Sequence, residues 1–186
     1  HSFPTRRSSD LQGPIGLCAT AGARLLGATT IIAVDGNDHR LGIAQKMGAD
    51  VTLNFKNCDV IDEIMKITGG RGADSAIEAL GTQATFESAL RSIKPGGTLS
   101  SLGVYSEDLK IPLSAFAAGL GDHKINTALC PGGKERMRRL MNVLASNRLD
   151  LGLLVTHQYK LDDIVAAYDL FAHQRDGVLK VAIKPQ

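Results

Sequence analysis

The sequence predicts an α/β protein built on a doubly wound parallel sheet, with helices on both faces. Strand-like and helix-like stretches alternate along most of the chain, as they do where helical crossovers join parallel strands. A glycine-punctuated turn opens the first helix-like stretch, the usual place for such a turn in these sheets. The alternation loses its rhythm near Cys130, so we expect a domain boundary there, between residues 12–129 and 130–186.

Four helix-like stretches in the first part of the chain have recognisable starts or stops. Asn37 and Asp59 suit the first position of two of them, because their side-chain oxygens can accept the free N–H groups of a first turn. Gly27 and Gly48 suit helix ends, where the backbone often turns left-handed. The expected helices span residues 14–26, 38–47, 59–68 and 82–94.

Apolar, often β-branched runs separate these helices and predict strands. Pro95, Gly96 and Gly97 form a turn that should lead into the last of them. The expected strands of the first part span residues 29–35, 50–55, 73–80 and 98–104. Beyond the boundary we expect a helix, a strand, a helix and a strand over residues 130–149, 154–161, 162–174 and 177–184.

The composition is that of a soluble folded protein, with 44% hydrophobic and 22% charged residues. A net charge of +2 gives no basic surface for nucleic acid. No apolar run approaches the roughly 20 residues that a membrane-spanning helix needs. The three cysteines, Cys18, Cys58 and Cys130, are too few and too far apart for a disulfide framework or a zinc site. We therefore expect a cytoplasmic protein.

Residues 1–11 do not fit this pattern. They are basic and rich in serine, they have no apolar period, and no Met begins them. Written back as codons, they resemble a common sequencing adapter translated in frame, so we exclude them from the fold prediction. We then expect the first, central strand of the sheet to be lost or replaced. Unpaired backbone groups on both neighbouring strands would leave such a chain aggregated or molten.

Gly13, Pro14, Ile15 and Gly16 lie where a strand should turn into a helix. Glycine lets the backbone approach a pyrophosphate, and the free N–H groups of a helix start attract its charge. The fingerprint of a dinucleotide site is incomplete, because Leu11 occupies the position of its first glycine. A plain Gly-Pro turn is the alternative.

Asp35 strengthens the case for a dinucleotide. It ends the second strand of the pattern, about 20 residues after Gly16, which is the spacing at which an acid meets the adenosine ribose. A carboxylate there accepts both ribose hydroxyls and repels a 2′-phosphate, so the sequence favours NAD over NADP. The alternative is that Asp35 merely caps the next helix.

Two further strand ends bear small residues at the same edge of the predicted sheet. Ala79 and Gly81 follow one strand, and Leu102, Gly103 and Val104 end the next. Ligands of a doubly wound sheet lie across the carboxyl ends of its strands, so this backbone can meet ribose and nicotinamide. Plain turns are the alternative.

No catalytic residue or metal ligand can be assigned from the sequence. His123, His157 and His173 lack the spacing of a metal site. No Ser-His-Asp or Cys-His set can be argued from residue order alone.

With these residues identified, the chain resembles the zinc-dependent medium-chain dehydrogenases, in particular the secondary-alcohol and threonine dehydrogenase branch. The resemblance spans residues 12–186. The motifs that carry it are GPIGLCA, GATTIIAVD followed by Arg40, GRGAD, KPGGTLSSLG, CPGG and LVTH. It implies a Rossmann-type NAD domain over residues 12–129 and the C-terminal part of a truncated catalytic domain over residues 130–186.

The resemblance also implies roles for single residues. Gly13 to Gly16 would form the pyrophosphate turn, and Arg40 would cover the adenine. The backbone of Leu102, Gly103 and Val104 would hold the nicotinamide amide. Ala128 and Leu129 would close that pocket.

The family's zinc ligands are a Cys, a His-Glu pair and a later acid, all upstream of the cofactor domain, and nothing in this sequence matches them. The resemblance therefore implies zinc in the full-length protein only, together with an alcohol or ketone substrate and a homo-oligomer. Two alternatives remain open, a polyol or threonine-type dehydrogenase and a stand-alone NAD-binding module without catalysis.

Overall fold

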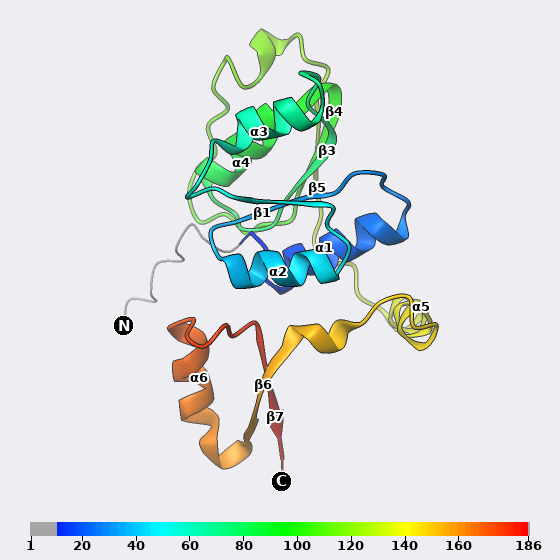
Figure 1. The fold of residues 1–186 in the computed structure, drawn as a ribbon, viewed down its shortest axis with the longest axis vertical. Helices are drawn as coiled ribbons and strands as arrows, with labels where there is room; N and C mark the ends of the chain where they lie inside the picture. The colour runs from blue at the N-terminus through cyan, green and yellow to red at the C-terminus, as the bar shows by residue number, and fades with distance from the viewer. Residues whose placement is uncertain (1–10, 186) are drawn as a thin grey trace. The chain divides into compact units, whose positions relative to one another are not determined.

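The structure is a computed structural model that describes residues 11–185 (Figure 1). The described residues form two compact units, 11–132 and 133–185. The division falls close to the boundary expected near Cys130, and the nature of each unit as a domain stays a prediction. The predictions made for residues 1–10, including a replaced first strand, lie outside the described residues.

The first unit shows the alternation of helices and strands that the sequence predicts. Its elements are α1 (Pro14–Leu25), β1 (Ile32–Asp35), α2 (Asp38–Lys46), β2 (Val51–Asn54), α3 (Val60–Ile67), β3 (Ala73–Glu78), α4 (Gln83–Ser92), β4 (Ile93–Ser101), a 3₁₀ turn (Ala117–Gly119) and β5 (Lys124–Thr127). The helix caps act as expected, since Asn37 accepts backbone N–H groups at the start of α2 and Asp59 does so at the start of α3. Gly27 and Gly48 adopt the left-handed backbone expected just beyond helix ends.

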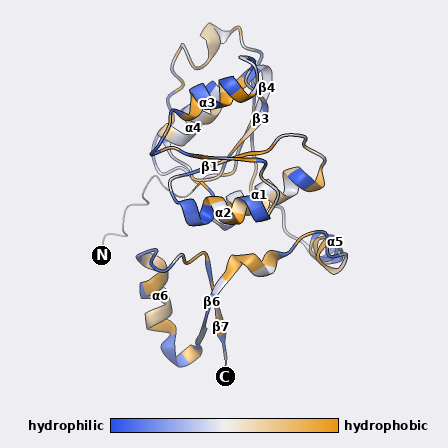
Figure 2. Ribbon diagram, in the orientation of Figure 1, coloured by the Kyte–Doolittle hydropathy of each residue, from blue (hydrophilic) through white to orange (hydrophobic). Residues whose placement is uncertain are grey.

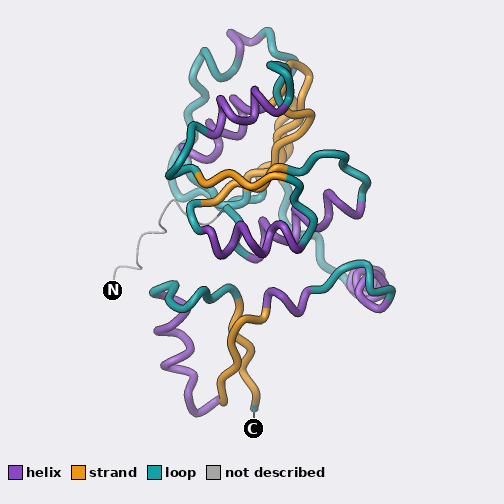
Figure 3. The backbone as a smooth tube through the Cα atoms, in the orientation of Figure 1, coloured by secondary structure: helices purple, strands orange, loops and turns teal. Residues whose placement is uncertain are grey.

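The strands of the first unit are all parallel, as predicted, but they form two sheets rather than one. β1 pairs with β2, and β3, β4 and β5 pair in that order (Figure 3). In a doubly wound sheet, a pair and a trio of strands in these orders lie on the two sides of the first strand. That strand would precede α1, and so it falls outside the described residues.

Two strands differ from the prediction for reasons of pairing. β4 begins at Ile93 instead of residue 98, because Ile93 already pairs with Ala73 across an irregular register. The Pro95–Gly97 turn is therefore part of the strand, and Gly96 donates its N–H to the carbonyl of Gly121 at 2.7 Å. β5 was not among the expected strands. It is a short, exposed edge strand whose existence depends on its pairing with β4.

Buried apolar residues lie along much of the first unit. One cluster joins α4 to the sheet of β3 and β4, and its buried members are Phe86, Leu90, Ile93, Leu99 and Ala115. The ring of Tyr105 packs edge-on against Phe86, with 6.2 Å between the ring centroids. Figure 1 shows α3 and α4 side by side next to these strands, and α1 beside α2.

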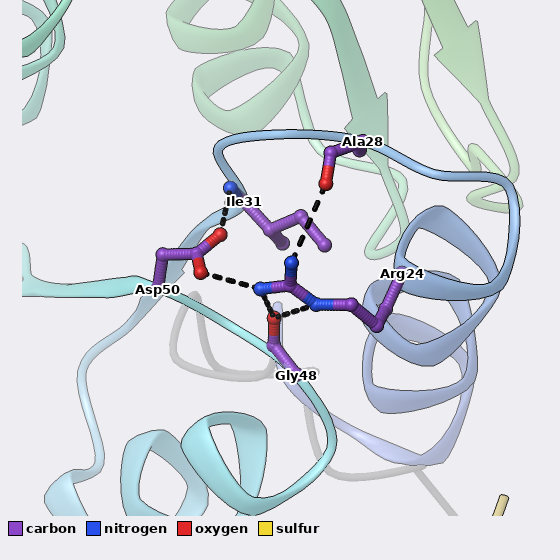
Figure 4. Close-up of polar contacts among 5 residues, drawn as sticks. All are labelled: Arg24, Ala28, Ile31, Gly48 and Asp50. Atoms are coloured by element: carbon purple, nitrogen blue, oxygen red, sulfur yellow. Dashed lines mark hydrogen bonds and ion pairs between the residues drawn. The ribbon is translucent and has the colours of Figure 1, made fainter. Parts of the chain in front are cut away.

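Arg24 ties together three segments at the end of the strands opposite Asp35 (Figure 4). Its guanidinium donates to the Gly48 carbonyl at 3.1 Å and 2.7 Å and forms an ion pair with Asp50. The other oxygen of Asp50 accepts the Ile31 N–H at 2.8 Å. The end of α1, the start of β1 and the turn into β2 are thereby fixed to one another, away from the predicted cofactor site.

The second unit has fewer helices and strands than the first and fewer buried apolar residues. Its elements are α5 (Lys134–Ala145), a 3₁₀ helix (Leu151–Leu154), β6 (Val155–Lys160), a 3₁₀ turn (Leu161–Asp163), α6 (Ile164–Ala172) and β7 (Lys180–Lys184). β6 and β7 form a parallel pair. α5 is shorter than the helix expected over residues 130–149, because Gly133 and Asn147 have positive φ angles that a helix cannot contain.

Apolar side chains of the second unit are only partly covered. Figure 2 shows hydrophobic residues gathered along the 3₁₀ helix of residues 151–154. The buried apolar residues of the second unit are Leu154, Ala167, Leu170, Val178 and Leu179. α5 has no buried residue. Within residues 11–185, no helix has both the length and the apolar character needed to cross a membrane.

Candidate functional site

The turn into α1 has the geometry expected of an anion-binding helix start. Gly13 is the N-cap residue and Pro14 occupies the first helical position, where its missing N–H costs nothing. The Leu17 N–H closes the first turn on the Gly13 carbonyl at 2.9 Å. No acidic side chain belongs to the first turn of α1 itself. Ile15 is 56% exposed beside the turn.

Gly16 is buried on the inner side of the same turn. A Cβ atom at this position would lie 1.9 Å from the Leu11 carbonyl oxygen. Only a residue without a side chain therefore lets the chain before α1 lie this close to the helix.

Asp35, at the end of β1, lies directly against this turn. One carboxylate oxygen accepts the Gln12 N–H at 2.7 Å and the other accepts the Asn37 N–H at 2.8 Å. The side chain is fully buried. The helix-cap alternative does not hold, because the side chain that caps α2 is that of Asn37. Arg40, in the first turn of α2, is also buried.

The two glycine-bearing strand ends, residues 79–81 and 102–104, are packed against each other. Leu102 donates its N–H to the Glu78 carbonyl at 2.7 Å. A Cβ atom on Gly81 would lie 2.4 Å from the Val104 carbonyl oxygen, and one on Gly103 would lie 2.2 Å from the Gly81 nitrogen. Both glycines are required by this contact, and Gly81 also has a φ of +90°. The structure thus brings these predicted residues together at the carboxyl ends of neighbouring parallel strands.

Ala128 and Leu129 lie just beyond β5 and are exposed. β5 pairs with β4 through Ser101 and Thr127, so the segment after β5 leaves the sheet at the same edge as Leu102. Their predicted role in closing a pocket is compatible with this position and stays a prediction.

The sequence analysis missed Glu78, the last residue of β3. Glu78 is 1% exposed, and its carboxylate accepts hydrogen bonds from the Leu80 and Gly81 N–H groups and from hydroxyls of Thr85 and Tyr105. A signal was present, because an acid between the apolar Ile77 and Ala79 at the end of a predicted strand is seldom buried without partners.

The surroundings of Glu78 keep it charged. Burial acts to raise the pKa of Glu78, but the N–H and O–H groups around the carboxylate, first among them the Gly81 N–H, hold that pKa below its ordinary value. Burial raises the pKa of the neighbouring Tyr105 hydroxyl to about 12; the Ser101 hydroxyl acts to lower it and Glu78 to raise it. At neutral pH the pair is therefore a carboxylate and a neutral phenol that donates to it.

Metal binding has no visible basis in this part of the protein. Among residues 11–185, no three or more His, Cys, Asp or Glu side chains are grouped so that they could hold an ion. Cys18 and Cys130 are exposed and Cys58 is half-buried, and none of the three forms a disulfide.

Comparison with known proteins agrees with the fold and with the predicted resemblance. Residues 14–146 match the family described as zinc-binding dehydrogenases. Over 174 residues the chain is 84% identical to an alcohol dehydrogenase of Cupriavidus necator, covering 94% of this chain and 48% of that protein. Over 174 residues it is 35% identical to the NADP-dependent isopropanol dehydrogenase of Thermoanaerobacter brockii, covering 92% and 49% of the two chains.

A solved structure gives the same result. The zinc dependent alcohol dehydrogenase 2 from Streptococcus pneumonia superposes with a TM-score of 0.85 and 33% identity, over 93% of this chain and 49% of that one. The chain thus spans about half the length of the relatives it matches.

Proposed function

Because the chain belongs to the zinc-binding dehydrogenase family, we propose that its first unit holds the NAD of an alcohol dehydrogenase. In that reaction a hydride passes between a secondary alcohol, or its ketone, and the nicotinamide ring. The observation that carries the proposal is the contact between the turn into α1 and Asp35, where the Gln12 N–H donates to the carboxylate at 2.7 Å. An anion-binding helix start and a ribose-binding acid must be adjacent to hold one dinucleotide.

The chain's own residues would bind and orient the cofactor. The free N–H groups at the start of α1 would bind the pyrophosphate, with Ile15 against it. The two carboxylate oxygens of Asp35 accept the N–H groups of Gln12 and Asn37. Because Asp35 is fully buried, a ribose hydroxyl would reach the carboxylate only by displacing groups that now lie against it, the Gln12 N–H among them. Arg40 would cover the adenine.

The nicotinamide end would be held by backbone groups of Leu102, Gly103 and Val104. The bound NAD supplies the hydride acceptor, and the protein supplies its position. Residues 11–185 contain no group of side chains that could hold zinc. Homo-oligomer formation and a cytoplasmic location are further expectations from the sequence.

The preference for NAD over NADP is the most easily tested part of the proposal. Several of the matched relatives are named as NADP-dependent, so family membership alone does not decide the cofactor. A carboxylate at the ribose repels a 2′-phosphate, and we expect the chain to bind NADH at least about tenfold more tightly than NADPH, or about 1.4 kcal/mol. Fluorescence titration with both nucleotides measures this ratio.

Two variants make the titration specific. Asp35→Gly should reduce the ratio of NADH affinity to NADPH affinity, because it removes the carboxylate that repels the 2′-phosphate. Asp38→Asn is the matched control, since Asp38 is a nearby acid whose side chain binds Asn54 at 2.6 Å, and it should leave the ratio unchanged. Equal affinities in the unsubstituted chain would rule out the ribose role of Asp35.

A cofactor-binding module without catalysis is the second candidate. It is favoured by one observation, that the predicted NAD contacts all lie in the first unit, which has its own core. Binding of NADH without any oxidation of 2-propanol, with zinc supplied, would support the module. Among dehydrogenases, a polyol or threonine-type substrate is the alternative, and matched relatives include a sorbitol dehydrogenase and an L-threonine 3-dehydrogenase.

A further inference from the structure

We propose that Glu78 is a positioning residue for the nicotinamide end of the cofactor, because its buried carboxylate holds two strand-end loops in one fixed arrangement. The loops are residues 79–81, after β3, and residues 102–104, after β4. The proposal rests on the proposed function, since these loops are the predicted contacts of the nicotinamide and its ribose.

One carboxylate oxygen of Glu78 fixes the first loop. It accepts the N–H groups of Leu80 at 2.7 Å and Gly81 at 2.8 Å, together with the Thr85 hydroxyl at 2.8 Å. Thr85 also forms a reciprocal cap with Thr82 at the start of α4. The loop and the first turn of α4 therefore share a single anchoring atom.

The rest of Glu78 fixes the second loop. Its other carboxylate oxygen accepts the Tyr105 hydroxyl at 2.8 Å and lies 3.4 Å from the Ser101 hydroxyl. These hydroxyls are 2.6 Å apart and lie on the two residues that flank the loop. The Glu78 carbonyl accepts the N–H of Leu102 itself at 2.7 Å.

The two loops are packed closely against each other and against Glu78. A Cβ atom on Gly103 would lie 2.6 Å from the second Glu78 oxygen and 2.2 Å from the Gly81 nitrogen. A displacement of either loop would therefore move the other or break hydrogen bonds to the buried carboxylate.

A carboxylate is the group that this position needs. The Leu80 and Gly81 N–H groups can only donate, and an ionised carboxylate is an acceptor with about four lone-pair sites. Glutamine would keep one acceptor oxygen for these N–H groups, whereas methionine has nearly the same length and no oxygen. Glu78→Met should therefore disturb the loops while nearly preserving the packing volume.

Cofactor pieces separate a positioning role from a general structural one. NADH reaches both loops, whereas ADP lacks the nicotinamide ring and its ribose. In Glu78→Met we expect NADH to bind about tenfold more weakly and ADP to change less than about twofold, measured by fluorescence and calorimetric titration. Glu87→Met, which removes a partly exposed partner of Arg91, is the matched control and should change neither affinity.

The possible outcomes are distinct. Equal weakening of NADH and ADP binding would show that Glu78 supports the whole site, and an unchanged NADH affinity would show that it supports none of it. Either result would overturn the inference alone. Failure of the unsubstituted chain to bind either ligand would overturn the proposed function and the inference with it.

Hydrogen exchange tests the same arrangement without a cofactor. The amides of Leu80 and Gly81 should exchange at least about tenfold faster in Glu78→Met, because they lose the acceptor that protects them. The amides of Ala33 and Val34, in β1, should be unchanged. Unchanged exchange at Leu80 and Gly81, or faster exchange at all four amides, would contradict the inference.

Discussion

The two units of the chain bury their apolar residues to very different extents. In the first unit, Leu17, Leu90 and Leu99 have exposures of 0–1%. In the second, Met137, Leu140 and Met141 of α5 are all more than half exposed, although they recur with helical spacing. The predicted cofactor residues lie in the unit with the core.

This difference shows what an apolar pattern can and cannot predict. Helical periodicity correctly predicts that α5 and α6 are helices and that each has an apolar face. It does not identify the surface that covers that face. In the first unit the covering surface is the sheet, whereas α5 has no buried residue against any part of the described chain.

The largest expected effect comes from cutting into the first core. Leu99→Ala removes a fully buried side chain from the middle of β4 and should lower the free energy of unfolding by about 3 kcal/mol. Leu140→Ala, on the exposed face of α5, should change it by less than about 0.5 kcal/mol. Urea unfolding followed by circular dichroism gives both values. Similar losses would mean that the two units are equally packed.

A steric test at the strand ends should give the next largest effect. Gly103→Ala places a methyl group 2.2 Å from the Gly81 nitrogen and should cost about 1–3 kcal/mol. Gly22 lies inside α1, and a Cβ atom added to it would meet no other atom within 4 Å. Gly22→Ala should therefore be neutral or stabilise the fold by up to about 1 kcal/mol. Thermal unfolding distinguishes them. If Gly103→Ala were harmless, the two loops would not be in contact.

Helix capping should give a smaller difference between the units. Asn37→Ala removes the side chain that caps α2 and should cost about 1 kcal/mol. Asn142→Ala, on an exposed turn of α5, should cost less than about 0.5 kcal/mol. Denaturant unfolding of both variants gives the comparison, and an equal cost would show that the cap contributes nothing specific.

The smallest effect is a change of stability with pH. The pKa of Glu78 is lower in the folded protein than its ordinary value, so its contribution is complete above about pH 4.5 and is lost as the pH falls through the folded-state pKa. Between pH 7 and pH 3, the free energy of unfolding should therefore decline less steeply in Glu78→Gln than in the unsubstituted chain. Parallel declines would mean that the carboxylate is not stabilised by folding.

Much of the fold could be read from local sequence signals. The helix starts at Asn37 and Asp59 and the turns at Gly27 and Gly48 depend on neighbouring residues only, and the structure confirms them. The adjacency of Asp35 to the glycine turn also follows from parallel topology, since both lie at the carboxyl edge of the sheet.

The features that escaped prediction depend on contacts between distant residues. Glu78 gains its role from its register opposite Ser101 and from the loop that brings Tyr105 to it. β5 and the early start of β4 are likewise set by pairing, which no single segment encodes.

The central claim is that the cofactor site belongs to the first unit, and hydrogen exchange with and without NADH tests it most directly. We predict slower exchange with NADH in residues 13–17, 79–81 and 102–104, and no change in α5. Protection concentrated in residues 133–185, or none anywhere at saturating NADH, would contradict the claim.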